Sequence, residues 1–314
     1  MKAVKVRKED GEKTRRYLAS KNILAKVPIK AEKEFLIIPV TEKPKKRFTL
    51  VDLNTKKKEE KLELPTSFDT IGDIAILEVR DEKKDEKKLA QNLLQQHKNI
   101  KVIAKKVGIH EGVFRLQKLK ILAGARRKET IHKENGIRLK LNVETCYFSP
   151  RLSTERRRIF EQVKKDESIL VMFSGVGPHL MTISKNTLAK EVYGIEINPE
   201  AHAYALENIK LNKTKNVHAY LGDVREVLPH FRKKFDRIIM PLPKDAGQFL
   251  KDALKVAKKG TVIHLYSFLH ETEIPKKAIE EVKAVLPKAK ILKVVKCGQY
   301  SPGKFRICTD FKVQ

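Results

Sequence analysis

Tryptophan is absent from this 314-residue chain, and cysteine is scarce. The three cysteines, Cys146, Cys297 and Cys308, form no C-x-x-C pair, so neither a zinc ribbon nor a disulfide framework is indicated. We therefore expect no metal and a reduced, cytoplasmic setting. No apolar run approaches the ~18 residues that a membrane-spanning helix needs, and the first residues lack the apolar segment of a secretory signal.

Acidic residues are also in short supply. The chain has 39 Asp and Glu against 68 Lys and Arg, which gives a net charge of +29. Such an excess repels itself on a compact surface unless a polyanion binds there, and nucleic acid is the commonest such partner. A lysine-rich thermophile surface is the alternative, but its ion-pair networks need similar numbers of acids and bases. The excess is spread along the chain, which favours a polyanion that touches several parts.

What is present is enough apolar sequence for packed cores, at 41% hydrophobic residues. The length predicts two domains or three small ones. We place the domains at residues 1–60, 61–148 and 149–314. A polar stretch at 53–64, rich in Lys and Glu, is predicted to be the first linker.

The first two domains mix strands and helices. The predicted elements are a strand at residues 4–6, a helix at 11–22 and a strand at 35–40, then a strand at 71–79, a helix at 84–97 and a strand at 101–104, followed by short strands at 118–122 and 137–143.

The third domain alternates strand, loop and helix, which is typical of a doubly wound, mostly parallel α/β sheet. Its last two strands form a hairpin-like pair and predict an antiparallel edge. We expect strands at 168–173, 191–197, 217–221, 235–240, 260–268, 289–297 and 305–311, with helices at 201–212 and 246–257 among those between them.

A glycine loop follows the first of these strands, in Phe173-Ser174-Gly175-Val176-Gly177-Pro178. Glycine lets the backbone approach a ligand closely. A dinucleotide fingerprint would need a third glycine where Leu180 stands, and the Lys-Ser/Thr of a phosphate loop is missing. The loop therefore favours a nucleoside-like ligand without a pyrophosphate.

Two acids end the next strands. Glu196 can accept both hydroxyls of a ribose, and Asp223 can reach an adenine edge. The structural alternative for each is a helix N-cap or a solvated loop acid. Together with the glycine loop, the pair favours S-adenosylmethionine.

Five motifs follow one another along the chain. They are Ile131-His132-Lys133-Glu134-Asn135-Gly136, Tyr147-Phe148-Ser149-Pro150-Arg151-Leu152, the glycine loop, Glu196-Ile197-Asn198-Pro199 and Gly222-Asp223-Val224-Arg225-Glu226. Taken in this order, they resemble the archaeal and eukaryotic tRNA (guanine-N1)-methyltransferases that modify position 37, and the resemblance covers most of the chain. A sister branch transfers the aminocarboxypropyl group of the same cofactor in wybutosine synthesis.

The resemblance implies an N-terminal domain that reads the outer tRNA fold, a middle RNA-facing domain and a class I, Rossmann-like methyltransferase domain. Guanine N1 carries a proton at neutral pH, so its methylation needs a base and a donor for the charge that develops on O6. The resemblance assigns the base to Glu155 and the donor to Arg115. By sequence alone, Glu155 is a first-turn helix acid and Arg115 one more solvated cation.

The resemblance also implies which residues contact the cofactor. They are Tyr147, Phe148, Arg156, Phe173, Ser174, Gly175, Gly177, Glu196, Ile197, Asp223, Val224 and Pro241. The structural alternative for Tyr147 and Phe148 is packing at a domain seam.

Two positions depart from the family pattern. Val171 stands where an Asp is usual, and Pro241 opens a motif that usually begins with Asn. Proline has no side-chain amide and no backbone N–H, so one polar contact to the cofactor or the guanine is expected to be lost.

The leading hypothesis is thus a monomeric, cytoplasmic enzyme that makes 1-methylguanosine at position 37 of tRNA. One alternative is an enzyme that acts on a modified guanosine, by methylation of the tricyclic wybutosine intermediate or by aminocarboxypropyl transfer. The other is a non-catalytic RNA-binding protein that retains the cofactor fold.

Overall fold

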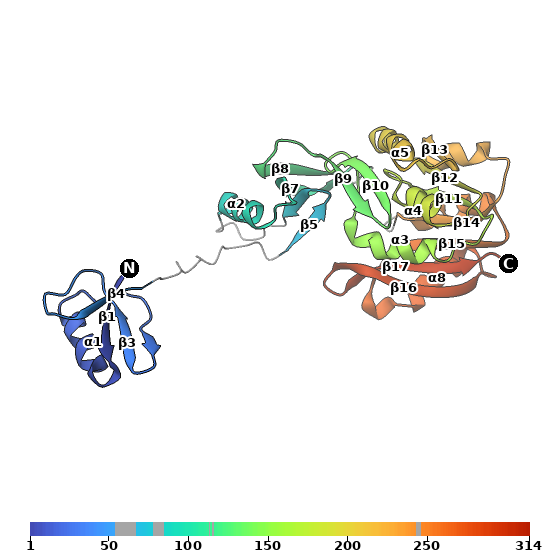
Figure 1. Ribbon diagram of the computed structural model, residues 1–314. Helices are drawn as coiled ribbons and strands as arrows, with labels where there is room; N and C mark the ends of the chain where they lie inside the picture. Colours follow the sequence, from blue (N-terminus) through green and yellow to red (C-terminus); the bar gives the residue numbers. More distant parts are fainter. Residues whose placement is uncertain (54–66, 78–84, 113, 115, 243–245) are drawn as a thin grey trace. The chain divides into compact units, whose positions relative to one another are not determined.

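The computed structural model describes residues 1–53, 67–77, 85–112, 114, 116–242 and 246–314 (Figure 1). The predicted linker falls outside these ranges for nearly its whole length. The chain forms two compact units, Met1–Leu62 and Glu63–Gln314, and each is described by itself.

The first unit is one helix against a four-stranded sheet. The strand order is β2-β3-β1-β4, and β1 is antiparallel to both of its neighbours. Val4, Leu18 and Ile38 are fully buried and form the centre of its core. The elements are β1 (Lys2–Arg7), a 3-10 turn at Lys8–Asp10, α1 (Gly11–Ser20), β2 (Lys30–Glu32), β3 (Phe35–Pro39) and β4 (Thr49–Asp52).

The second unit begins with another four-stranded sheet, of order β5-β6-β7-β8. Here β6 and β7 are parallel, and α2 connects them. A separate two-stranded hairpin, β9–β10, follows. The elements are β5 (Phe68–Ile71), β6 (Ile74–Leu77), α2 (Glu86–Gln96), β7 (Val102–Glu111), β8 (Leu116–Gly124), β9 (Glu129–Glu134) and β10 (Ile137–Asn142).

The single strand predicted at 71–79 is wrong. The chain turns at Gly72 and Asp73, so that β5 and β6 pair antiparallel. Gly72 has a φ of +58°, which favours glycine, and Asp73 forms an ion pair with Arg127. Asp73 also accepts a 2.8 Å hydrogen bond from Thr130, so contacts far along the chain fix this turn.

The remainder is a seven-stranded sheet of order β13-β12-β11-β14-β15-β17-β16. The first five strands in that order are parallel, and β17 is antiparallel to β15 and β16, which confirms the predicted fold class and antiparallel edge. The strands are β11 (Ser168–Met172), β12 (Glu191–Glu196), β13 (Val217–Leu221), β14 (Phe235–Met240), β15 (Ala257–His270), β16 (Lys290–Ser301) and β17 (Lys304–Lys312).

Helices cover both faces of this sheet. They are α3 (Ser153–Phe160), α4 (Pro178–Asn186), α5 (Pro199–Asn212), α6 (Val224–Val227), α7 (Leu250–Lys255) and α8 (Lys276–Val285), with 3-10 turns at Pro150–Leu152, Leu228–His230, Ala246–Phe249 and Glu271–Glu273. The helix predicted at 246–257 is thus shorter. Leu250 and Ala253 turn inward, and β15 already begins at Ala257.

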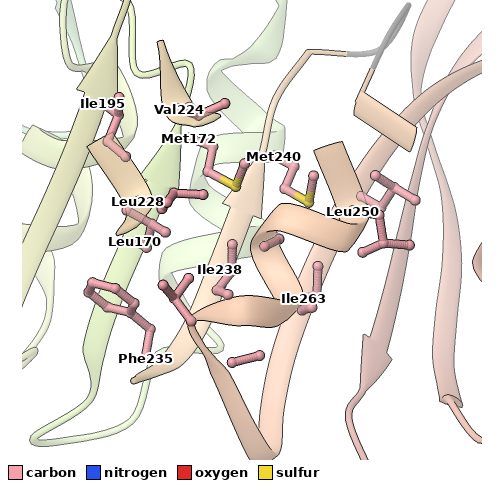
Figure 2. Close-up of a cluster of buried hydrophobic side chains, with 14 of the residues drawn as sticks. Leu170, Met172, Ile195, Val224, Leu228, Phe235, Ile238, Met240, Leu250 and Ile263 are labelled. Atoms are coloured by element: carbon pink, nitrogen blue, oxygen red, sulfur yellow. The ribbon is translucent and has the colours of Figure 1, made fainter. Parts of the chain in front are cut away.

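Alternate residues of β11 pack in opposite directions. Leu170 and Met172 join the core that also holds side chains of α6, α7 and α8, and Figure 2 shows both in that cluster. Ile169 and Val171 join the core beneath α3 and α4. This two-residue period, buried on both sides, is why the strand reads as an unbroken apolar run.

In the part of the chain that the structure describes, no helix combines the length and apolar character needed to cross a membrane.

Candidate active site

The glycine loop connects β11 to α4 at the centre of the parallel sheet. Three of its residues have positive φ: Phe173 at 60°, Gly175 at 57° and Gly177 at 85°. Gly177 is the left-handed residue just before α4, and Pro178 is well suited to the first turn because its missing N–H would have no partner there. The sheet continues from β11 to β12 and β13 on one side and to β14 and β15 on the other, so the strand order reverses at β11. Open α/β sheets bind their ligands at such a point.

Glu196 ends β12 and holds this loop in place. Its carboxylate accepts hydrogen bonds from the Gly175 N–H at 2.6 Å and from the Asn198 N–H at 2.9 Å. Burial raises the pKa of Glu196 above its ordinary value, although the backbone donors oppose this. A carboxylate has about four acceptor sites, so Glu196 can still accept from a ligand hydroxyl.

Asp223 lies two residues beyond the end of β13 and serves as the N-cap of α6. It accepts from the Arg225 N–H at 2.8 Å and pairs with the Arg225 guanidinium at 2.6 Å. These hydrogen bonds from Arg225 lower the pKa of Asp223. The N-cap role considered from sequence is therefore real, and it coexists with a place on the pocket wall.

A pocket of about 170 Å³ lies between these strand ends. Phe173 and Phe249 meet edge to face on its wall, with ring centroids 5.0 Å apart, and Arg225 lies 5.3 Å from the Phe249 ring. Pro241 and Leu242, which follow β14, complete this side. An apolar, aromatic wall with a few carboxylates suits a nucleoside.

Most of the predicted cofactor residues line this pocket: Tyr147, Phe173, Gly175, Glu196, Ile197, Asp223, Val224 and Pro241. Ser174 and Gly177 belong to the loop behind it. The Ser174 Oγ is buried and has no hydrogen-bond partner in the described structure. Sequence reasoning missed Asn198, Leu242 and Phe249, and only the Asn198-Pro199 helix start carried a local signal.

Arg156 lies elsewhere. It is 2% exposed and forms a two-pronged ion pair with Glu134, with both N–O distances at 2.5 Å. It also donates to the Ser149 carbonyl, and its guanidinium lies 5.1 Å from the Phe148 ring. These contacts tie β9 to α3, and the placement gives no support to a contact between Arg156 and the cofactor.

Glu155 is buried at the start of α3, and it lines neither this pocket nor the larger one described below. The Arg158 guanidinium donates hydrogen bonds to both carboxylate oxygens of Glu155, at 2.7 and 2.8 Å, and the Tyr266 hydroxyl donates to one of them at 2.6 Å. Tyr266 carried no local sequence signal, because it reaches Glu155 only through the folded sheet. The other predicted catalytic residue, Arg115, lies outside the described residues.

Behind Glu155 lies a buried polar network. Arg158 also forms an ion pair with Asp310. The Asp310 carboxylate is hydrogen-bonded to Nδ1 of His264 at 2.6 Å, and Nε2 of His264 is hydrogen-bonded to the Arg237 guanidinium at 2.7 Å. The hydrogen bonds from His264 and Arg158 hold the pKa of Asp310 well below its usual range, against the effect of burial. Donor atoms of His264, Asp310 and Cys308 lie close enough to suggest metal ligands. Two flanking arginines make a cation unfavourable there.

A second and larger pocket, about 480 Å³, shares Tyr147 with the first. Its walls come from the β5–β8 sheet, from the segment 146–152 that includes Phe148, and from β15, β16 and β17. Tyr147 therefore stands between a nucleoside-sized pocket and a roomier one.

Three protein-family models match successive parts of this chain. Residues 130–295 match the TRM5/TYW2 methyltransferase domain, residues 52–127 the TYW2 N-terminal domain and residues 3–48 the tRNA methyltransferase 5 N-terminal domain. The tRNA (guanine(37)-N(1))-methyltransferase Trm5b of Pyrococcus abyssi is 40% identical, over 99% of this chain and 98% of the relative.

Two solved structures are similar over nearly the whole length. One is the complex of aTrm5 with tRNALeu, 31% identical with a TM-score of 0.73, covering 99% of both chains. The other is Methanocaldococcus jannaschii Trm5 in complex with adenosine, 33% identical with a TM-score of 0.70, covering 100% of this chain and 99% of the other.

Proposed function

The chain belongs to the TRM5/TYW2 methyltransferase family, and we propose that it transfers the methyl group of S-adenosylmethionine to N1 of guanosine 37 in tRNA. The observation that carries this proposal is full-length similarity to a tRNA (guanine37-N1)-methyltransferase, together with a nucleoside-sized pocket at the sheet's switch point. The enzyme binds tRNA and uses S-adenosylmethionine.

The residues of the smaller pocket fit this cofactor. Glu196 keeps free acceptor sites for two ribose hydroxyls, and a Cβ built on Gly175 would meet only the Tyr147 carbonyl, at 3.7 Å, so the loop leaves room for a ligand. We assign the ribose to Glu196 and the adenine to the wall of Phe173, Phe249 and Asp223. When bound, the cofactor supplies an electrophilic methyl group.

For the base, we propose Glu155. The hydrogen bonds from Arg158 and Tyr266 fix the orientation of the Glu155 carboxylate, and general-base catalysis needs a fixed orientation. Because Glu155 is buried and lines neither pocket, this role requires that binding of the target guanine opens a path to its carboxylate. Arg115 remains our proposal for the donor to O6.

Glu155→Gln tests that role, because it keeps the shape of the side chain and removes the base. Single-turnover methyl transfer should fall by about 10²-fold or more, while tRNA and cofactor affinity stay close to the parent's. Glu161→Gln, in the residue that follows α3, is the control. Parental rate and pH profile in Glu155→Gln would leave Glu155 a structural acid.

We also propose the division of labour among the three parts. Residues 1–60 would read the outer fold of tRNA, residues 61–148 would face the RNA near the target, and residues 149–314 would carry the chemistry. A monomer that acts in the cytoplasm without a metal completes the proposal.

Pro241 favours a second candidate substrate, a guanosine 37 that is already modified. It lines the smaller pocket where the family pattern places Asn, so the chain lacks one polar group there. Residues 52–127 also match a TYW2 domain, from the sister branch. On this alternative, the enzyme would act on the tricyclic wybutosine intermediate.

The decisive experiment is incubation with labelled S-adenosylmethionine and unmodified tRNA, followed by nucleoside analysis by mass. We expect 1-methylguanosine, and no product from tRNA with adenosine at position 37. Label found only with tRNA carrying the tricyclic intermediate would support the alternative. Cofactor binding without turnover on either substrate would leave a non-catalytic RNA-binding protein.

A further inference from the structure

An exposed aromatic pair stands at the larger pocket. Tyr300, on β16, is 61% exposed, and its ring lies over that of Phe268 on β15, with centroids 4.1 Å apart and planes 34° from parallel. Both residues line the pocket. A large aromatic ring that is mostly exposed yet held by a second ring is poorly explained by core packing.

The backbone of β16 is irregular where it forms this wall. Its register against β17 shifts between Lys296 and Gly298, and again between Gln299 and Ser301. Tyr300 is thus the extra residue of a β-bulge, opposite no single residue of β17. Bulges re-aim side chains and concentrate beside functional sites. The two bulges place the run from Cys297 to Tyr300 along the pocket.

Arg306 joins the pair to Tyr147. It stands opposite Phe268 in the β15–β17 register, and its guanidinium lies 5.4 Å from the Phe268 ring centroid. Its Nη2 donates to the Tyr147 hydroxyl at 3.1 Å. Its Nε is buried and has no hydrogen-bond partner within the described residues. The aromatic pair is therefore one contact away from the residue that borders the cofactor pocket.

The charge around the pair selects the kind of ligand. Along β16 and β17 the only acid is Asp310, which is 1% exposed and already paired with Arg158 and His264. Two exposed lysines of these strands, Lys296 and Lys304, lie in the part of the β16–β17 ladder that holds Tyr300, and Lys106 and Arg306 line the pocket. Cations beside exposed, stacked rings are the pattern of single-stranded nucleic-acid binding.

We propose that Tyr300, supported by Phe268 and Arg306, is a stacking platform for an unpaired tRNA base next to guanosine 37. This inference rests on the proposed function, because it takes the anticodon loop as the ligand. The platform holds the neighbouring base while guanosine 37 passes Tyr147 toward the cofactor. The cation beside Phe268 strengthens the stack.

The test uses the full-length protein and anticodon stem-loops with 2-aminopurine immediately before or immediately after guanosine 37. Tyr300→Ala should weaken stem-loop binding about five- to a hundredfold and abolish quenching of the probe at one of the two positions. Tyr300→Phe, which keeps the ring, should behave like the parent. Leu292→Ala, at another exposed apolar residue of β16, is the matched control.

Parental affinity and quenching in Tyr300→Ala would overturn the platform. So would equal losses in Tyr300→Ala and Tyr300→Phe, or in Leu292→Ala, because stacking depends on the ring at position 300. These measurements need no methyl transfer. A protein that binds stem-loops through Tyr300 but forms no 1-methylguanosine would therefore refute the proposed function and keep the platform. A protein that forms 1-methylguanosine but binds stem-loops equally well without the Tyr300 ring would refute the platform and keep the proposed function.

Discussion

Glu196 has two tasks that use the same carboxylate. It fixes the glycine loop through the Gly175 and Asn198 N–H groups, and it offers its remaining acceptor sites to a ribose. Because backbone donors orient both oxygens before any ligand arrives, binding costs little further ordering.

We predict that Glu196→Ala weakens S-adenosylmethionine binding more than tenfold, because two hydroxyls lose a charged acceptor. Calorimetry at pH 7 measures this, with Glu207→Ala on the exposed face of α5 as the control. Unchanged affinity in a folded Glu196→Ala protein would remove Glu196 from the ribose site.

Cofactor affinity should also depend on acidity. Burial raises the pKa of Glu196, so the protonated form is populated at higher pH than for an ordinary Glu. Ribose hydroxyls donate best to the ionised carboxylate, so affinity should fall as the pH drops through that raised pKa. Titration of affinity against pH should show this fall in the parent. A Glu196→Gln variant with the same pH profile would assign it to another group.

Substitution of Pro241 distinguishes between the two candidate substrates, plain guanosine 37 and the tricyclic intermediate. If a lost polar contact limits the rate, Pro241→Asn should speed single-turnover methylation of plain guanosine by about ten- to a hundredfold, since one transition-state hydrogen bond is worth about 1–3 kcal/mol. If Pro241 instead makes room for a modified base, the variant should lose activity on the tricyclic intermediate only. Parallel assays on the two tRNAs decide, and no change on either would remove Pro241 from the reaction.

At the scale of elements, α5 holds the β9–β10 hairpin through two asparagine side chains, which form the hydrogen bonds with the β10 backbone that a neighbouring strand would form. Asn208 donates to the Lys140 carbonyl at 3.0 Å and accepts from the Lys140 N–H at 2.7 Å. One turn later, Asn212 makes the same pair of bonds with Arg138, at 2.6 and 2.9 Å. Both amides are buried, so the edge of β10 is satisfied by a helix.

Removing one of these amides should loosen the hairpin. Asn208→Ala would leave the Lys140 N–H and carbonyl without partners, and we expect a loss of about 2–4 kcal/mol in unfolding free energy. Denaturant unfolding measures this. Lys210→Ala, exposed on the same helix, should stay within about 0.5 kcal/mol. Equal stability of the two variants would show that water replaces the amide.

For the whole molecule, the basic charge and the separate first unit belong together. The charge of +29 is far more than one catalytic pocket needs, and Met1–Leu62 has its own buried core. A polyanion that contacts distant parts of the chain accounts for both.

Deletion of residues 1–60 should therefore spare the chemistry and weaken recognition. We expect a greater loss of affinity for full-length tRNA than for an anticodon stem-loop, with single-turnover methylation of the stem-loop retained. Filter binding and rapid-quench assays on both RNAs measure this. Equal losses on the two substrates would show that this unit does not read the outer tRNA fold.

The sequence by itself determined the parallel sheet, the glycine loop and the acids at or just beyond the ends of β12 and β13, because these signals are local. A strand buried on both faces must be apolar, and positive φ angles such as those of Gly175 and Gly177 favour glycine. The same locality explains the errors. The turn at Gly72 looked like the middle of one strand, because the partners that fix it, Arg127 and Thr130, lie far along the chain.

Only the tertiary structure decided which polar residues meet. Arg156 and Glu155 are neighbours in sequence, yet Arg156 turns to Glu134 on β9, while Glu155 accepts a hydrogen bond from Tyr266 on β15. Likewise, no pattern in the β16 sequence places Tyr300 over Phe268. Such pairs depend on register, bulges and burial, which arise when distant strands are brought together, and a local pattern carries no information about its distant partner.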